Sequence, residues 1–178
     1  PAAAAAQEGP TTGFAPPPPP PEPEPVERPE GVTEEVVRET FGDWTVVCLG
    51  ESDFCSMRAV ALNPEGSPGA QIDLVRLPRG GPALGGMTAI VPLVVLLNEG
   101  LVTVVDDGQP VVQDYDFCRQ NGCLARFGLT EGQITEMRRG AVMGLVMSAV
   151  DVPQNPIVMR LSLTGFTAAW NSMRPQAR

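Results

Sequence analysis

Four cysteines in two close pairs are the feature that most constrains the fold of this chain. Six residues separate Cys48 from Cys55, four separate Cys118 from Cys123, and turn-forming residues stand beside both pairs. The chain contains no histidine. Cysteines spaced in this way are typical of small local disulfide loops in an exported protein, because cytosolic thiols are kept reduced. We therefore predict two disulfides, Cys48–Cys55 and Cys118–Cys123.

Other chemistry for these cysteines fits the spacing less well but stays open. A four-thiolate zinc site or a redox pair usually contains Cys-x₂-Cys, and both spacings here are looser. A calcium site could be formed only by aspartates that match no known calcium loop, namely Asp106, Asp107, Asp114 and Asp116. The seven methionines do not indicate heme without histidine or a Cys-x₂-Cys-His element. We expect no metal and no cofactor.

Residues 1–40 differ in composition from the rest of the chain. They contain eleven of the 20 prolines, including the unbroken run Pro16–Pro21, and eight glutamates against two arginines. Such a segment buries too little apolar surface to offset chain entropy, and its proline run favours extended polyproline II. We predict an extended Pro-rich N-terminal tail over residues 1–40, a folded domain over 41–173 and a C-terminal tail over 174–178.

Charge and hydropathy exclude two classes of partner. Of the net charge of −9, residues 1–40 carry −6, and the only basic cluster is Arg138–Arg139. A duplex-binding protein needs a basic face, so we expect no nucleic-acid binding. The longest apolar run, residues 90–97, is interrupted by Pro92 and is far shorter than the ~20 residues that span a bilayer, so we expect no transmembrane segment. We interpret the alanine-rich residues 1–7 as what remains after an export signal is removed.

After Phe41 the chain consists mainly of short β-prone runs between turn signals. We expect seven or so strands, drawn from residues 45–48, 55–62, 71–77, 90–97, 101–105, 111–118, 123–127, 142–150 and 157–163. The glycine-rich stretch 79–86 is predicted to be a flexible loop. A short helix is predicted over 129–140, where Thr130 and Gln133 fit a capping box, and a last helical turn or two over 166–173. This pattern predicts an all-β fold, an antiparallel β-sandwich with one or two short helices.

Four sequence elements are distinctive when taken together. The first is a Gly-Asp-Trp strand over 41–48 that ends in Cys48, with Cys55 after it. The others are Pro92-Leu93-Val94 followed by Gly100-Leu101 and Asp107-Gly108, then Cys118 with Gly122-Cys123, and finally Leu161-Ser162-Leu163-Thr164-Gly165-Phe166-Thr167-Ala168-Ala169. In these elements the chain, over about residues 41–173, resembles the invasion-associated locus B family of exported alphaproteobacterial proteins.

This resemblance implies an immunoglobulin-like β-sandwich and a location in the periplasm or outside the cell. It also places one disulfide at the loop after the first strand and the other at a later turn. The family is named after a role in host-cell invasion, and the resemblance supplies no catalytic residues.

The residues themselves give little support to an enzyme. Ser148, Ser162 and Ser172 have no histidine to activate them, and no Gly-x-Ser-x-Gly element is present. A carboxylate-dependent hydrolase would need an acidic pair such as Asp106-Asp107 or Asp114 with Asp116, but turns and solvated strand edges explain these residues. We predict no catalytic residue.

Protein–protein contact is the function that this sequence favours. We predict a non-enzymatic periplasmic or secreted binding module whose partner is an envelope or host protein. The alternative is an accessory subunit docked through its Pro-rich tail on the periplasmic face of a membrane complex. The residues predicted to contact a partner lie in the tail and in the glycine-rich loop: Phe14, Pro16, Pro17, Pro18, Pro19, Pro20, Pro21, Arg79, Gly80 and Gly81.

Overall fold

The computed structural model describes residues 34–151 and 153–175. Eleven strands occur in this part of the chain: β1 (Glu35–Phe41), β2 (Trp44–Leu49), β3 (Cys55–Leu62), β4 (Pro68–Arg76), β5 (Gly85–Val91), β6 (Leu101–Val105), β7 (Val111–Gln113), β8 (Phe117–Arg119), β9 (Gly122–Leu129), β10 (Val142–Met147) and β11 (Ile157–Ser162). The helices are α1 (Glu131–Arg139), α2 (Phe166–Ser172) and a 3-10 turn η1 (Leu97–Glu99). The partner contacts predicted at Phe14 and Pro16–Pro21 lie outside the described residues.

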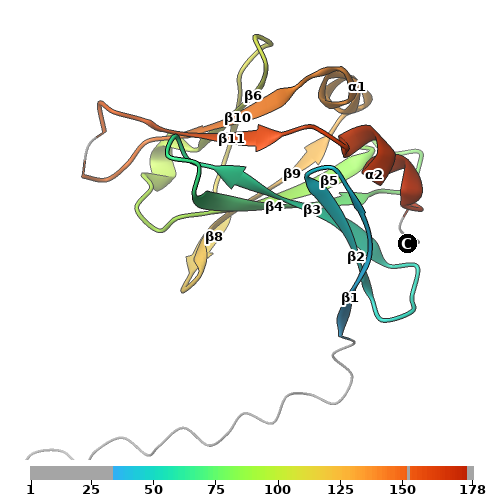
Figure 1. The fold of residues 1–178 in the computed structure, drawn as a ribbon. Coiled ribbons are helices and arrows are strands. Elements are labelled where there is room, and N and C mark those ends of the chain that lie inside the picture. The colour runs from blue at the N-terminus through green and yellow to red at the C-terminus, as the bar shows by residue number, and fades with distance from the viewer. Residues whose placement is uncertain (1–33, 152, 176–178) are drawn as a thin grey trace, which may run out of the picture. The chain divides into compact units, whose positions relative to one another are not determined.

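All the strands belong to one antiparallel sheet that curls over on itself. Its order is β7-β6-β10-β11-β3-β4-β5-β9-β8, and the β1–β2 hairpin joins it through β3. Strands β11 and β3 share one register pair, Arg160 with Leu62, so the sheet bends at this join. Strands β6, β10 and β11 consequently lie opposite β3, β4, β5 and β9 (Figure 1). The predicted all-β, sandwich-like fold is confirmed.

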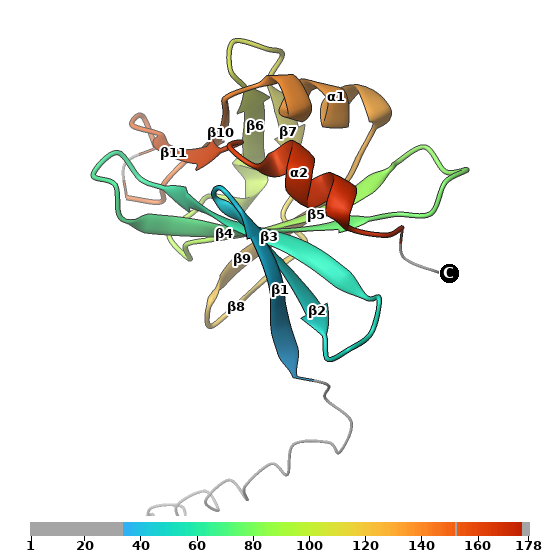
Figure 2. The same cartoon turned by 45° about the vertical axis from the view of Figure 1, so that its right-hand side comes forward.

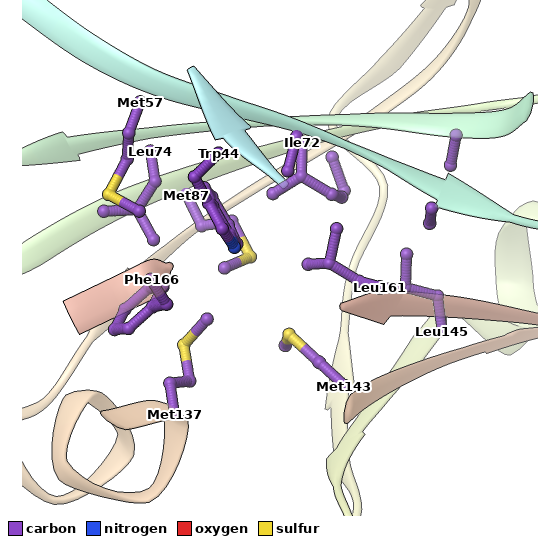
Figure 3. Packing of buried hydrophobic residues seen from close by; sticks show 14 of the residues in the cluster. Trp44, Met57, Ile72, Leu74, Met87, Met137, Met143, Leu145, Leu161 and Phe166 are labelled. Carbon is purple, nitrogen blue, oxygen red and sulfur yellow. The ribbon is translucent and has the colours of Figure 1, made fainter. Parts of the chain in front are cut away.

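The core lies between these two layers. Buried and partly exposed residues alternate along β5 and β10, as expected for strands with one face turned inward. Figure 3 shows methionine, leucine and isoleucine side chains from both layers meeting around Trp44 and Phe166. The Trp44 and Phe166 rings are edge-to-face at 5.3 Å, and the Trp44 indole nitrogen donates to the Ser162 carbonyl at 3.0 Å. Trp44 therefore joins β2 to both α2 and β11.

Strand β1 shows that the folded region begins earlier than predicted. It starts at Glu35, inside the stretch assigned to the tail, and pairs with β2 from Glu35–Leu49 to Phe41–Trp44. Its side chains up to Thr40 are exposed, so no buried apolar face marks it in the sequence. Backbone pairing and the 3.0 Å ion pair between Glu35 and Arg58 hold it instead. The boundary predicted at residue 41 is thus corrected to about residue 35.

Both predicted disulfides are present and cross adjacent strands. Cys48 of β2 lies directly opposite Cys55 of β3, with 4.0 Å between their Cα atoms. Cys118 of β8 lies opposite Cys123 of β9 at 3.9 Å. Each bond therefore closes a hairpin whose strands are already hydrogen-bonded.

The two helices lie next to each other on the same side of the domain (Figure 2). Helix α1 begins as predicted, since the Gln133 amide donates to Thr130 Oγ1 at 3.3 Å and the Thr130 amide donates to Gln133 Oε1 at 2.9 Å. Ile134 and Met137 are its buried residues. In α2, Phe166, Ala169 and Trp170 are buried. The helices thus close one side of the core with these residues.

Candidate functional site

A pocket of about 500 Å³ lies between the two helices and the loop that joins β4 to β5. Three arginines contribute to its lining: Arg76 at the end of β4, Arg79 in the loop and Arg138 in α1. Trp170 of α2 forms part of its wall. We call this site the arginine pocket. It joins elements that are far apart in the chain, since Arg76 and Trp170 are 94 positions apart.

Arg76 is the most enclosed of the three cations. Its guanidinium carbon lies 5.5 Å from the centre of the Trp170 ring, and its Nη1 donates to the carbonyls of Met173 at 3.1 Å and Trp170 at 3.4 Å. Burial lowers the pKa of Arg76, and the positive charges of Arg79 and Arg138 lower it further. These contacts stabilise and orient the guanidinium without neutralising its charge.

The close fit of Trp170 depends on a small residue at the start of β5. A Cβ atom on Gly85 would lie 3.0 Å from the Trp170 ring and 3.5 Å from Ile134. Trp170 is 2 % exposed and stacks on Phe166 at 6.2 Å between ring centres. The aromatic wall on which Arg76 rests is therefore fixed by the core behind it.

Arg138 and Arg79 occupy the outer part of the pocket. Nη2 of Arg138 donates to Asn171 Oδ1 at 3.1 Å, which ties α1 to α2, while Arg79 is exposed. The ion pairs found among the described residues involve other arginines: Arg58, Arg126 and Arg174. One carboxylate, that of Glu131, lines the pocket, and it forms no ion pair with a described residue. The three arginines therefore leave the pocket with an excess of positive charge.

One of the three loop residues predicted to contact a partner lines the arginine pocket, and the other two do not. Arg79 lines the pocket, whereas Gly80 and Gly81 are exposed on the same loop and do not line it. Sequence reasoning did not identify Arg76, Arg138 or Trp170. In the sequence Arg138 stands out only as part of a basic pair, and nothing local links it to Arg76.

Two of the four aspartates considered for catalysis or calcium, Asp106 and Asp116, have structural contacts in this fold. Asp106 accepts hydrogen bonds from the amides of Ala141 at 3.0 Å and Val142 at 3.0 Å, and Asp116 pairs with Arg126 at 3.1 Å. No cluster of three or more cysteine, aspartate or glutamate side chains suited to a metal ion occurs within residues 34–151 and 153–175.

Two of the three serines considered as nucleophiles, Ser162 and Ser172, use their hydroxyls in local hydrogen bonds. Ser162 Oγ accepts from the Thr164 amide at 3.2 Å, and Ser172 Oγ donates to the Ala169 carbonyl at 2.9 Å. The carbonyl of Ser148 accepts from the Leu96 amide at 2.9 Å. The hydroxyls of Ser162 and Ser172 thus stabilise the turn before α2 and the end of that helix.

A sequence model of the invasion associated locus B (IalB) protein family matches residues 44–174. The chain belongs to this family. It is 27 % identical over 135 residues to invasion protein B homologs of Brucella abortus strain 2308 and of Brucella abortus biovar 1 strain 9-941. The match covers 75 % of this chain and 76 % of each relative.

The crystal structure of invasion associated protein B from Bartonella henselae has the same fold. The TM-score is 0.64 at 24 % identity, and the match covers 75 % of this chain and 92 % of the Bartonella chain. The resemblance drawn from the Gly-Asp-Trp, Cys…Gly-Cys and closing elements is thereby confirmed. Among the described residues, no helix is both long and apolar enough to cross a membrane. The two disulfides, Cys48–Cys55 and Cys118–Cys123, are typical of exported proteins.

Proposed function

We propose that this IalB family member is a non-enzymatic protein of the periplasm or the exterior that acts by binding a protein partner. The observation that carries this proposal is the arginine pocket. Each of the three guanidinium groups in the pocket has five N–H donors. Among these groups, only Nη1 of Arg76 and Nη2 of Arg138 donate a hydrogen bond to a described residue. The pocket therefore offers unused donors on a fixed framework, which is the property of a recognition surface.

The chemistry of the pocket supports binding better than catalysis. Guanidinium groups remain protonated at physiological pH, so they cannot exchange protons as general acids or bases. Thr135, the hydroxyl-bearing residue of the lining, donates to the Glu131 carbonyl at 2.8 Å within α1. A two-carboxylate hydrolase requires a second acidic residue near the first. Glu131 is the one carboxylate among the described residues that line the pocket. These residues can hold a ligand but supply no activated nucleophile.

Affinity capture from detergent-solubilised envelopes, followed by titration of the purified components, tests this function. The full-length, disulfide-bonded protein serves as bait beside a bait that lacks residues 1–33 and keeps β1 intact. We expect one saturable protein partner for both baits. Capture lost with residues 1–33 would support the accessory-subunit alternative, in which the Pro-rich tail docks on a membrane complex. Absence of any saturable protein partner for either bait would contradict the proposal.

The hydrolase alternative has its own test. Loss of a turnover shown by the wild-type protein, in an Asp107→Asn or Asp114→Asn variant that keeps the fold, would support a carboxylate-dependent enzyme. We expect no turnover that depends on either aspartate.

A further inference from the structure

The arginine pocket combines two kinds of surface that together define a ligand. Its cationic part consists of Arg76, Arg79 and Arg138, whose charges are close enough to lower the pKa of Arg76. Its apolar part consists of Leu77, Leu84, Ile134 and Trp170. A fitting ligand therefore carries negative charge beside an apolar group.

Carboxylate fits this pocket better than phosphate. Glu131 lines the pocket and would repel a phosphate dianion, with both charges on one group, more strongly than single carboxylates spread over two arginines. An arginine fork matches the two oxygens of a carboxylate in bidentate geometry. The apolar wall gives no contact to a free inorganic anion, but it can accept an aliphatic side chain next to an acidic one.

The volume of the pocket sets the size of the ligand. About 500 Å³ lies within the usual range of small-ligand sites and holds a few side chains of one peptide segment. The exposed loop with Gly80 and Gly81 stands at its edge, where a longer chain can leave the pocket. These dimensions fit one short segment of a larger partner.

We propose that the arginine pocket binds an acidic peptide segment of the partner, with glutamate or aspartate carboxylates on Arg79 and Arg138 and an adjacent apolar side chain on Leu77 and Leu84, which are partly exposed. This inference rests on the proposed function, because it names the chemistry by which the partner is recognised. Arg76, fixed on Trp170, contributes charge at the base of the site.

Fluorescence anisotropy with the full-length protein tests this assignment. The probe is a short labelled peptide in which glutamates alternate with leucines, with both ends blocked so that its only carboxylates are side chains. The matched probe has glutamine in place of every glutamate. The variants are Arg79→Gln combined with Arg138→Gln, and Arg139→Gln as a control that removes an exposed charge next to Arg138 but outside the pocket. Circular dichroism establishes that each variant is folded.

We expect the wild-type protein to bind the glutamate probe at least about tenfold more tightly than the glutamine probe. The double variant should raise the Kd for the glutamate probe by about tenfold or more, and Arg139→Gln by less than about twofold. Binding should weaken as salt is added, because two of the three cations are exposed. Equal affinity for both probes, or equal binding by wild type and double variant, would overturn the inference, as would binding of inorganic phosphate but not of the glutamate probe.

The same variants separate this inference from the proposed function. If the double variant captures the wild-type partner with unchanged affinity, the partner binds elsewhere, so the carboxylate inference fails and the proposed function stands. If neither protein binds a partner, the proposed function fails as well. If the wild-type protein captures the partner and the double variant does not, the result supports both the carboxylate inference and the proposed function.

Discussion

Gly165 offers the sharpest test of how α2, and with it Trp170, is positioned. It precedes α2 with a φ of 88°, a left-handed conformation that side chains disfavour. A Cβ atom at this position would collide with the carbonyl of Phe41 and lie 3.0 Å from the Gly42 nitrogen. These atoms are backbone at the β1–β2 turn, so no side-chain rotation can relieve the collision. We expect Gly165→Ala to separate α2 from this turn.

Gly66 provides the matched control for the magnitude. Its φ is 83°, but a Cβ atom there would have nothing within 4 Å. Gly66→Ala should therefore cost only the left-handed conformation, about 1–2 kcal/mol. Gly165→Ala should cost the same amount plus about 1–3 kcal/mol for the forced displacement, as in an overpacked core. The total expected for Gly165→Ala is about 2–5 kcal/mol.

Urea unfolding, monitored by far-UV circular dichroism, measures the loss of stability in both variants. The urea concentration at the midpoint should fall for both variants, and further for Gly165→Ala. An unchanged dependence of the unfolding free energy on urea would show that the variants expose the same surface on unfolding as the wild-type protein. A Gly165→Ala variant no less stable than Gly66→Ala would refute the packing of α2 against the β1–β2 turn.

Three other changes test separate features. Replacing Cys48 and Cys55 together by serine should lower the free energy of unfolding by about 2.5 kcal/mol for the eight residues in the closed loop, measured by urea denaturation; no loss would contradict the entropic reasoning. Burial raises the pKa of Tyr115 to about 12 from 10.0, so the folded state holds the phenolic proton more tightly and stability should fall as pH rises from about 10 to about 12. Tyr115→Phe should remove that alkaline loss, and a pH profile unchanged by it would assign the loss to other groups. Thr130→Ala should cost about 1 kcal/mol in thermal or urea unfolding by removing the capping box of α1, and a neutral result would show that packing alone sets this end.

Local signals predicted much of this fold. The disulfides were predictable because each pair is close in sequence, and α1 because its cap residues lie three positions apart. Strand positions from β2 onward mostly followed the β-prone runs and turn signals. Such features depend on neighbouring residues along the chain, so they can be predicted without a structure.

Features set by tertiary pairing were not predictable. The run 90–97 was expected to be a buried strand, but β5 spans Gly85–Val91 and ends before Pro92, which has no N–H for the ladder. Leu93 and Val94 beyond it are exposed. The first two residues of β5, Gly85 and Gly86, lie in the stretch expected to be a flexible loop, because pairing with β4 and β9 decides their conformation. Local propensity gave no sign of this pairing.

The arginine pocket could not be predicted from the sequence either, because it also depends on tertiary packing. Arg79 was predicted to contact a partner because it opens a glycine-rich loop, but its neighbours come from β4, α1 and α2. In the sequence, Arg138 belongs to a basic pair near the end of a predicted helix, and Trp170 lies in the last predicted helical turns. Only the curling of the sheet and the docking of both helices bring these residues together.

NMR titration of the full-length protein with the glutamate–leucine peptide shows whether carboxylates bind in the arginine pocket. If carboxylates bind in the arginine pocket, the largest shifts occur at the side-chain N–H signals of Arg79 and Arg138 and at the methyl signals of Leu84, and the glutamine peptide leaves them unchanged. Largest shifts at a distant cation, such as Arg119 beside Phe117, would contradict the claim, as would equal shifts with both peptides.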